Sequence, residues 1–222
     1  MGRWSTGPEE GTGPVVQAPQ SDGASHVAAK WRDSFLRHLE NSEVAEPLGQ
    51  AAMAERVTDW TSLLTTVVVR SCGDFGWPVA AKGHPLAVLP QRGQEYLGID
   101  VVAVPDSSGA SISAPRWPAP LAVFELENSP RDDRVAYSLW KVLSVRAKLH
   151  VVMAYRRTWE QAIALPNRVA ADVLPGLRHS GESHLDEVVF VMGSRSDGAS
   201  FPWGYFKFWR LDHGVGRFTK LS

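Results

Sequence analysis

The 222-residue sequence contains one cysteine, no long apolar run and almost no net charge. A single cysteine, Cys72, can form no internal disulfide and excludes a zinc site built from several cysteines. The longest apolar runs are too short to cross a bilayer, and the N-terminal stretch has no apolar signal-peptide core. We therefore expect a cytoplasmic protein that does not associate with a membrane.

Positive and negative charges are balanced along the chain, with 23 Lys and Arg against 24 Asp and Glu. A net charge of −1 produces no global field that would steer the protein onto nucleic acid or a membrane surface. Any binding to a polyanion therefore has to come from a local basic patch.

The hydrophobic content of 44% is sufficient for one sizeable core. Residues 1–25 are rich in Gly, Pro, Ser and Thr, so we expect a flexible tail there, followed by a single domain over residues 26–222. Apolar spacing predicts helices at 28–39, 50–70, 128–148 and 159–173. It predicts strands at 77–81, 85–89, 96–104, 121–127, 149–155, 188–192, 203–210 and 216–221.

Helices and strands that alternate in this way predict an α/β fold, a mixed central sheet flanked by helices. The expected core runs from about residue 50 to 155 in the order helix, three strands, helix, strand. A further helix and further strands follow it toward the C-terminus.

Carboxylates stand in two of the predicted apolar strands. Asp100 lies within the strand predicted at 96–104, and Glu125 and Glu127 lie at the end of the strand predicted at 121–127. Alternate residues of a strand share a face, so Glu125 and Glu127 project to the same side, roughly 6–7 Å apart. If the two strands are neighbours, the Asp100 carboxylate can lie close to those of Glu125 and Glu127. Like charges at that density repel, and Mg²⁺ or Mn²⁺ with oxygen ligands relieves the repulsion.

The helix predicted after these acids is basic on one side. Arg134, Tyr137, Lys141 and Lys148 share a helical stripe, and the opposite stripe is apolar. Residues 131–157 hold seven Lys and Arg, including Arg131, against two acidic residues. A basic band beside a carboxylate cluster suits an anionic substrate such as a phosphodiester. The other interpretation is a solvated helix face.

These acids and the order of the elements resemble the PD-(D/E)XK nuclease superfamily, which has the restriction-endonuclease-like fold. That family has a helix, three strands, a helix and a strand, with an acid on the second strand and a (D/E)-x-K pair on the third. The resemblance assigns metal-ligand roles to Asp100 and Glu125. An acid of the preceding helix often contributes in the family, and Glu55 is the candidate here, with Asp59 one turn on.

The sequence departs from the family pattern at position 127, where Glu stands in place of Lys. Some restriction enzymes also carry an acid there, and in others the lysine has moved to the following helix, where Lys141 matches. The resemblance thus implies a Mg²⁺- or Mn²⁺-dependent nuclease, most simply a DNA endonuclease. In it, Lys141 would stabilise phosphorane charge and Glu127 would accept a proton. Arg131, Arg134, Tyr137 and Lys148 would bind the nucleic acid.

Two other functions stay open at this point. A nuclease fold that has lost catalysis would act as a module that binds nucleic acid or protein, and the missing lysine favours it. In a purely structural subunit, the acids would be surface residues. The family resemblance also allows a homodimer, and the sequence does not decide between DNA and RNA.

Overall fold

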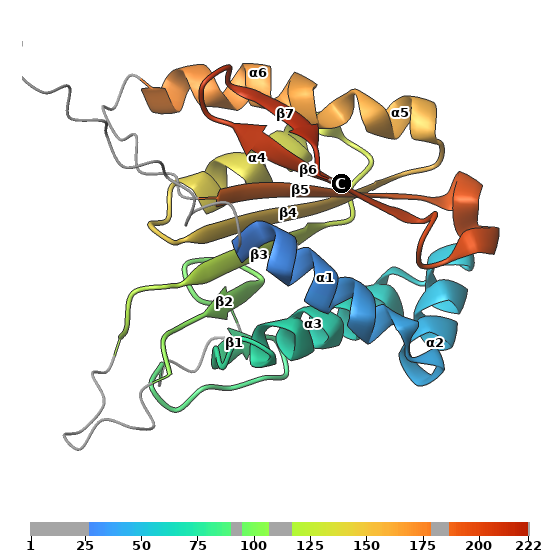
Figure 1. Ribbon diagram of the computed structural model, residues 1–222, viewed down its shortest axis with the longest axis horizontal. Helices are drawn as coiled ribbons and strands as arrows, with labels where there is room; N and C mark the ends of the chain where they lie inside the picture. Colours follow the sequence, from blue (N-terminus) through green and yellow to red (C-terminus); the bar gives the residue numbers. More distant parts are fainter. Residues whose placement is uncertain (1–26, 90–94, 107–116, 179–186, 222) are drawn as a thin grey trace, which may run out of the picture.

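The computed structural model describes residues 27–89, 95–106, 117–178 and 187–221 (Figure 1). The predicted tail at residues 1–25 lies outside these ranges. Among the described residues, no helix is long and apolar enough to cross a membrane. The fold is the expected mixed α/β arrangement, a seven-stranded sheet flanked by helices.

The strands follow one another across the sheet in chain order. Strands β3, β4 and β5 are parallel, and the strands on either side are antiparallel. Their bounds are β1 Val79–Ala81, β2 Val101–Ala103, β3 Ala122–Glu127, β4 Leu149–Arg156, β5 Glu187–Ser194, β6 Phe206–Asp212 and β7 Arg217–Lys220. The burial of nearly every residue of β3, β4 and β5 is typical of central strands covered on both faces.

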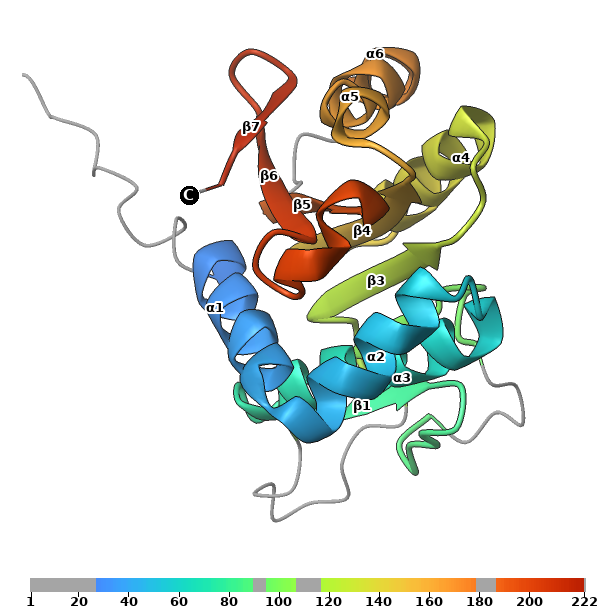
Figure 2. The ribbon, with the colours of Figure 1, turned by 90° about the vertical axis from the view of Figure 1, so that its right-hand side faces the viewer.

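Helices cover both faces of the sheet, and Figure 2 shows the sheet between the two groups. The first group is α1 (Val27–Glu40), α2 (Ser42–Met53) and α3 (Val57–Gly73), and the second is α4 (Asp132–Leu143), α5 (Trp159–Ile163) and α6 (Leu165–Arg178). A short 3₁₀ segment, η2 (Arg195–Ser200), connects β5 to β6. The core is accordingly divided into two apolar clusters, one under each group.

Helix α1 shows how the apolar spacing produces this packing. Trp31, Phe35 and Leu39, spaced four residues apart as predicted, are all completely buried. The ring of Trp31 lies 5.4 Å from that of Phe124 in β3, and Phe35 lies 5.4 Å from Phe206 in β6. One face of this helix thus contacts strands that are distant in the sequence.

Two predicted helices have different bounds in the structure. The helix predicted at 50–70 is two helices, because the chain turns between Met53 and Val57 and Glu55 adopts a positive φ of 56°. The helix predicted at 128–148 spans only Asp132–Leu143. Its apolar stripe nevertheless packs against the sheet as predicted, since Val135, Leu139, Val142 and Leu143 are buried.

The strand predictions also need two corrections. Residues 85–89 form turns rather than a strand, and β2 is limited to Val101–Ala103. The chain before β2 is a tight turn closed by a bridge between Tyr96 and Ile99, with positive φ at Leu97 and Gly98. Backbone in that conformation cannot continue a strand. The turn leaves Asp100 directly at the start of β2.

Candidate functional site

Asp100 and Glu125 lie opposite each other on adjacent strands. The register pairs Val101 of β2 with Phe124 of β3, so the next pair outward is Asp100 with Glu125. Residues opposite each other in an antiparallel pair share a face of the sheet. Both carboxylates therefore lie on the face that α4 covers.

Hydrogen bonds hold the two carboxylates against each other's strand. The Asp100 N–H donates to Oε1 of Glu125 at 3.2 Å, and the Leu126 N–H donates to Oδ2 of Asp100 at 2.8 Å. Glu125 is buried, with 4% of its surface exposed, and Asp100 is partly buried. The two acids expected to share a site are thus brought together by backbone contacts in both directions.

Helix α4 contributes a cation and a hydroxyl to this pair. Nζ of Lys141 lies 2.8 Å from Oε2 of Glu125 and also donates to the Gly98 carbonyl oxygen at 2.5 Å. The Ser138 hydroxyl donates to Oε2 of Glu125 at 3.2 Å, one turn earlier on the helix. The helix that follows β3 thus places a positive charge directly at Glu125.

Glu127 lies at the outer end of the same group. Its Oε1 accepts a hydrogen bond from the Ser129 N–H at 2.7 Å, and its Oε2 lies 3.4 Å from the Ser138 hydroxyl. Ser138 thus contacts Glu125 and Glu127, which confirms that the two side chains project to the same side of β3. Glu127 is only partly buried.

The surroundings raise the pKa of both central acids. Burial above all, and then the Asp100 carboxylate, raise the pKa of Glu125 to about 7, although Lys141 opposes the change. Burial also raises the pKa of Asp100, to which the charges of Glu95 and Glu127 add, against the Leu126 N–H and Lys141. A carboxyl group with a pKa near neutrality in such a cluster is a candidate functional group.

The donor set fits a hard divalent cation. Among the described residues, no group of three His, Cys, Asp or Glu side chains is placed to hold a metal ion by itself. Mg²⁺, however, is usually bound by one or two carboxylates and completes its coordination with water and substrate phosphates. Asp100 and Glu125 supply two such carboxylates.

The structure does not bring Glu55 into contact with these acids. Its turn between α2 and α3 lies on the side of the other helical group, where its carboxylate forms an ion pair with Arg195. Asp59 pairs with Arg56 one turn earlier on the exposed side of α3. The metal-ligand role predicted for Glu55 assumed a continuous helix, which the structure interrupts at this residue.

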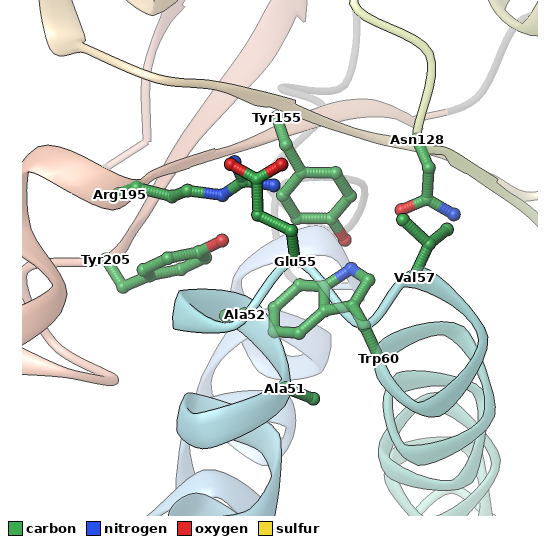
Figure 3. A pocket seen from close by; sticks show the side chains of 9 residues that line it. All are labelled: Ala51, Ala52, Glu55, Val57, Trp60, Asn128, Tyr155, Arg195 and Tyr205. Carbon is green, nitrogen blue, oxygen red and sulfur yellow. The ribbon is translucent and has the colours of Figure 1, made fainter.

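A small cavity lies beside Glu55 (Figure 3). It measures about 40 Å³, and the side chains around it include Glu55, Trp60, Asn128, Tyr155, Arg195 and Tyr205. Ala51, Ala52 and Val57 also line it, so the cavity lies on the side of α2 and α3, whereas α4 covers the acids. Burial is the main cause that raises the pKa of Tyr155. The volume of the cavity suits a water molecule rather than a substrate.

The predicted nucleic-acid contacts divide between the two ends of the sheet. Arg131 and Arg134 lie exposed at the start of α4, beside the end of β3 where the acids are. Arg131 is paired with Asp133 at 2.5 Å. Lys148 directly precedes β4, and because β3 and β4 are parallel it lies at the end of the sheet away from Glu127. Lys148 is therefore distant from the acids, and it does not belong to α4, which ends at Leu143.

Two residues that contact or flank the site were not recognised from the sequence. Ser138 lies in the apolar run of α4, and only its contacts with Glu125 and Glu127 reveal it. Trp140 is 48% exposed and stacks on the predicted Tyr137, with ring centroids 5.9 Å apart. The three-residue spacing of Trp140 from Tyr137 was a usable signal, because residues three apart are neighbours on a helix.

Comparisons of the chain with models of known protein families, with curated proteins and with solved structures found no significant match.

Proposed function

We propose that this protein is a metal-dependent nuclease with a restriction-endonuclease-like core. The observation that carries the proposal is the pair formed by Asp100 and Glu125, with Nζ of Lys141 at 2.8 Å from Glu125. The order α3, β1, β2, β3, α4, β4 supports it, with β3 and β4 parallel across a helical crossover. The two acids and the lysine thus lie directly before the second strand, in the third strand and in the following helix.

Asp100 and Glu125 would hold one Mg²⁺ or Mn²⁺ ion together with water and the substrate phosphate. When bound, the ion would supply Lewis acidity at the phosphodiester and lower the pKa of a water molecule. Ser138 orients the Glu125 carboxylate, because its hydroxyl donates to the same Oε2 atom that Lys141 contacts. The protein thereby fixes the orientation of the acid before any ligand arrives.

The ammonium group of Lys141 would stabilise negative charge that develops on the phosphate. Contacts with Glu125 and with the Gly98 carbonyl oxygen fix the orientation of this ammonium group before a substrate binds. Glu127, at the more accessible edge, would accept a proton from the attacking water. Arg131 and Arg134 at the start of α4 would contact phosphates of the strand, for which DNA is our first candidate.

A second candidate function is a module that binds nucleic acid or protein without cleaving it. The specific observation in its favour is that Lys141 already offers Glu125 a positive charge within the protein. A lysine in that position could replace a metal ion as the compensating charge. The two candidates therefore differ in whether a divalent cation has a function at Glu125.

The test is cleavage of labelled DNA and RNA by the purified chain with Mg²⁺, with Mn²⁺ and with EDTA. We expect metal-dependent cleavage that Glu125→Gln and Asp100→Asn each abolish, with circular dichroism to verify folding. Asp172→Asn is the matched control, because Asp172 is exposed on α6. Cleavage that persists in both acid variants would refute the proposal, whereas nucleic-acid binding without cleavage in any metal would favour the module.

A further inference from the structure

An exposed aromatic pair stands on α4 next to the acids. Tyr137 and Trp140 are 52% and 48% exposed, and their rings stack with an interplanar angle of 26°. The core does not use them, because the opposite side of α4 already packs against the sheet. Two large aromatic rings side by side on a soluble surface are uncommon unless they bind something.

Lys141 connects this pair to the acids. Its Nζ lies 5.7 Å from the centre of the Tyr137 ring and 2.8 Å from Oε2 of Glu125. One ammonium group therefore lies over the Tyr137 ring and pairs with the buried carboxylate at the same time. A ligand lying on Tyr137 and Trp140 would extend directly to the position where Lys141 and Glu125 meet.

The charge around the pair suits a nucleic-acid strand. Arg134 lies one helical turn before Tyr137, is exposed, and forms no ion pair within the described part of the chain. Aromatic side chains beside basic ones are the usual means of binding single strands, because bases stack on the rings while cations contact the phosphates. In a duplex the faces of internal bases are already stacked on their neighbours, so a surface of this kind cannot reach them.

We propose that Tyr137 and Trp140 form a platform on which unpaired bases stack, so that the substrate is a single-stranded nucleic acid or a single-stranded segment. This inference rests on the proposed nuclease function, since it specifies the substrate class of the same site. The platform would position the strand so that a neighbouring phosphate lies beside Lys141, Asp100 and Glu125.

The test measures fluorescence anisotropy of a labelled oligothymidylate and of a labelled duplex of equal length, with the full chain in EDTA so that nothing is cleaved. We expect the single strand to bind more tightly than the duplex by about ten-fold or more. Tyr137→Ala and Trp140→Ala should each weaken single-strand binding by roughly 5- to 150-fold. Tyr137→Phe, which retains the ring, should bind like the unaltered chain.

Trp203→Ala is the matched control, because Trp203 is 57% exposed but lies in the connection between η2 and β6. Unchanged single-strand binding in both alanine variants, or equal affinity for the duplex, would overturn the inference. The same holds if the unaltered chain binds neither probe, which would leave the aromatic pair to a protein partner. The nuclease proposal is tested by a different experiment, the cleavage assay, and it fails if the unaltered chain cleaves nothing with Mg²⁺ or Mn²⁺.

Discussion

Asp100 and Glu125 each accept a hydrogen bond from the backbone of the other's strand. The N–H of Asp100 donates to Glu125, and the N–H that follows Glu125 donates to Asp100. The two carboxylates therefore link β2 to β3 beyond the last residue pair of the ladder, and at the same time repel each other. An arrangement that costs electrostatic free energy and is held by backbone contacts is what a preorganised site requires.

The raised pKa of Glu125 predicts how the stability of the metal-free protein depends on pH. Its folded-state pKa of about 7 lies above the ordinary value of 4.5, so the folded state binds the proton more tightly than the unfolded chain. The resulting stabilisation is complete below about pH 4.5 and is lost as the pH rises through about 7. Its full size is up to about 3 kcal/mol.

Urea unfolding at a series of pH values, in EDTA, measures this contribution as the difference between the unaltered chain and Glu125→Gln. The comparison is needed because Asp132 acts in the opposite direction: burial would raise its pKa, but Arg156 and Arg168 together lower it. We expect the unaltered chain to lose stability relative to the glutamine variant between about pH 4.5 and 7. A pH-independent difference would show that Glu125 ionises normally.

A divalent cation should stabilise the protein through the same two carboxylates. At a concentration 100 times the dissociation constant, binding to the folded state adds about 2.7 kcal/mol, which corresponds to a rise in Tm of roughly 5–10 °C. The rise should be larger at pH 8 than at pH 6, because the ion binds the ionised form of Glu125. Differential scanning fluorimetry with Mg²⁺ or Mn²⁺ measures it. A rise of equal size in Asp100→Asn and Glu125→Gln would place the ion elsewhere.

Replacement of Lys141 by methionine should separate catalysis from binding. If its ammonium stabilises charge on the reacting phosphate, kcat should fall by about 100-fold or more while KM changes little. Binding of the divalent cation should persist, because a positive charge next to Glu125 has been removed. Steady-state cleavage assays provide the measurement, and Lys30→Met, on the exposed side of α1, is the control. An unchanged kcat would remove Lys141 from the mechanism.

The two ends of the basic region should differ in their effect on nucleic-acid binding. Arg134→Ala should weaken binding and reduce the slope of log affinity against log salt by about 0.7–0.9, the loss of one phosphate contact. Lys148→Ala should change neither, because Lys148 lies at the opposite end of β3 and β4 from the acids. Titrations at several salt concentrations test both, and a similar loss in the two variants would indicate a strand that follows the whole of α4.

Local periodicity was enough to predict several features of the site. The two-residue period of β3 places Glu125 and Glu127 on one side, where both contact Ser138. The helical period after β3 separates a buried stripe from an exposed one and puts Tyr137 and Lys141 on the same side. These relationships depend only on the periodicity of one strand or one helix, so they can be predicted without knowing what packs against that element.

The positions where prediction failed depend on contacts between elements. Glu55 was expected inside a helix, but the packing of α2 and α3 requires a turn there, with a positive φ that spacing alone does not reveal. Lys148 was expected on the same helix as Arg134 and Lys141, but α4 ends five residues before it.

The sequence by itself determined which side chains share a face of β3 and of α4, because that follows from the geometry of one strand or one helix. Only the tertiary structure decided that Asp100 lies opposite Glu125 and that Lys141 reaches both Glu125 and the Gly98 carbonyl. It also decided that Tyr137 and Trp140 stay exposed together. The physical reason is that strand register and helix ends are set by the packing of the whole core, in which residues far apart in the chain compete for the same contacts.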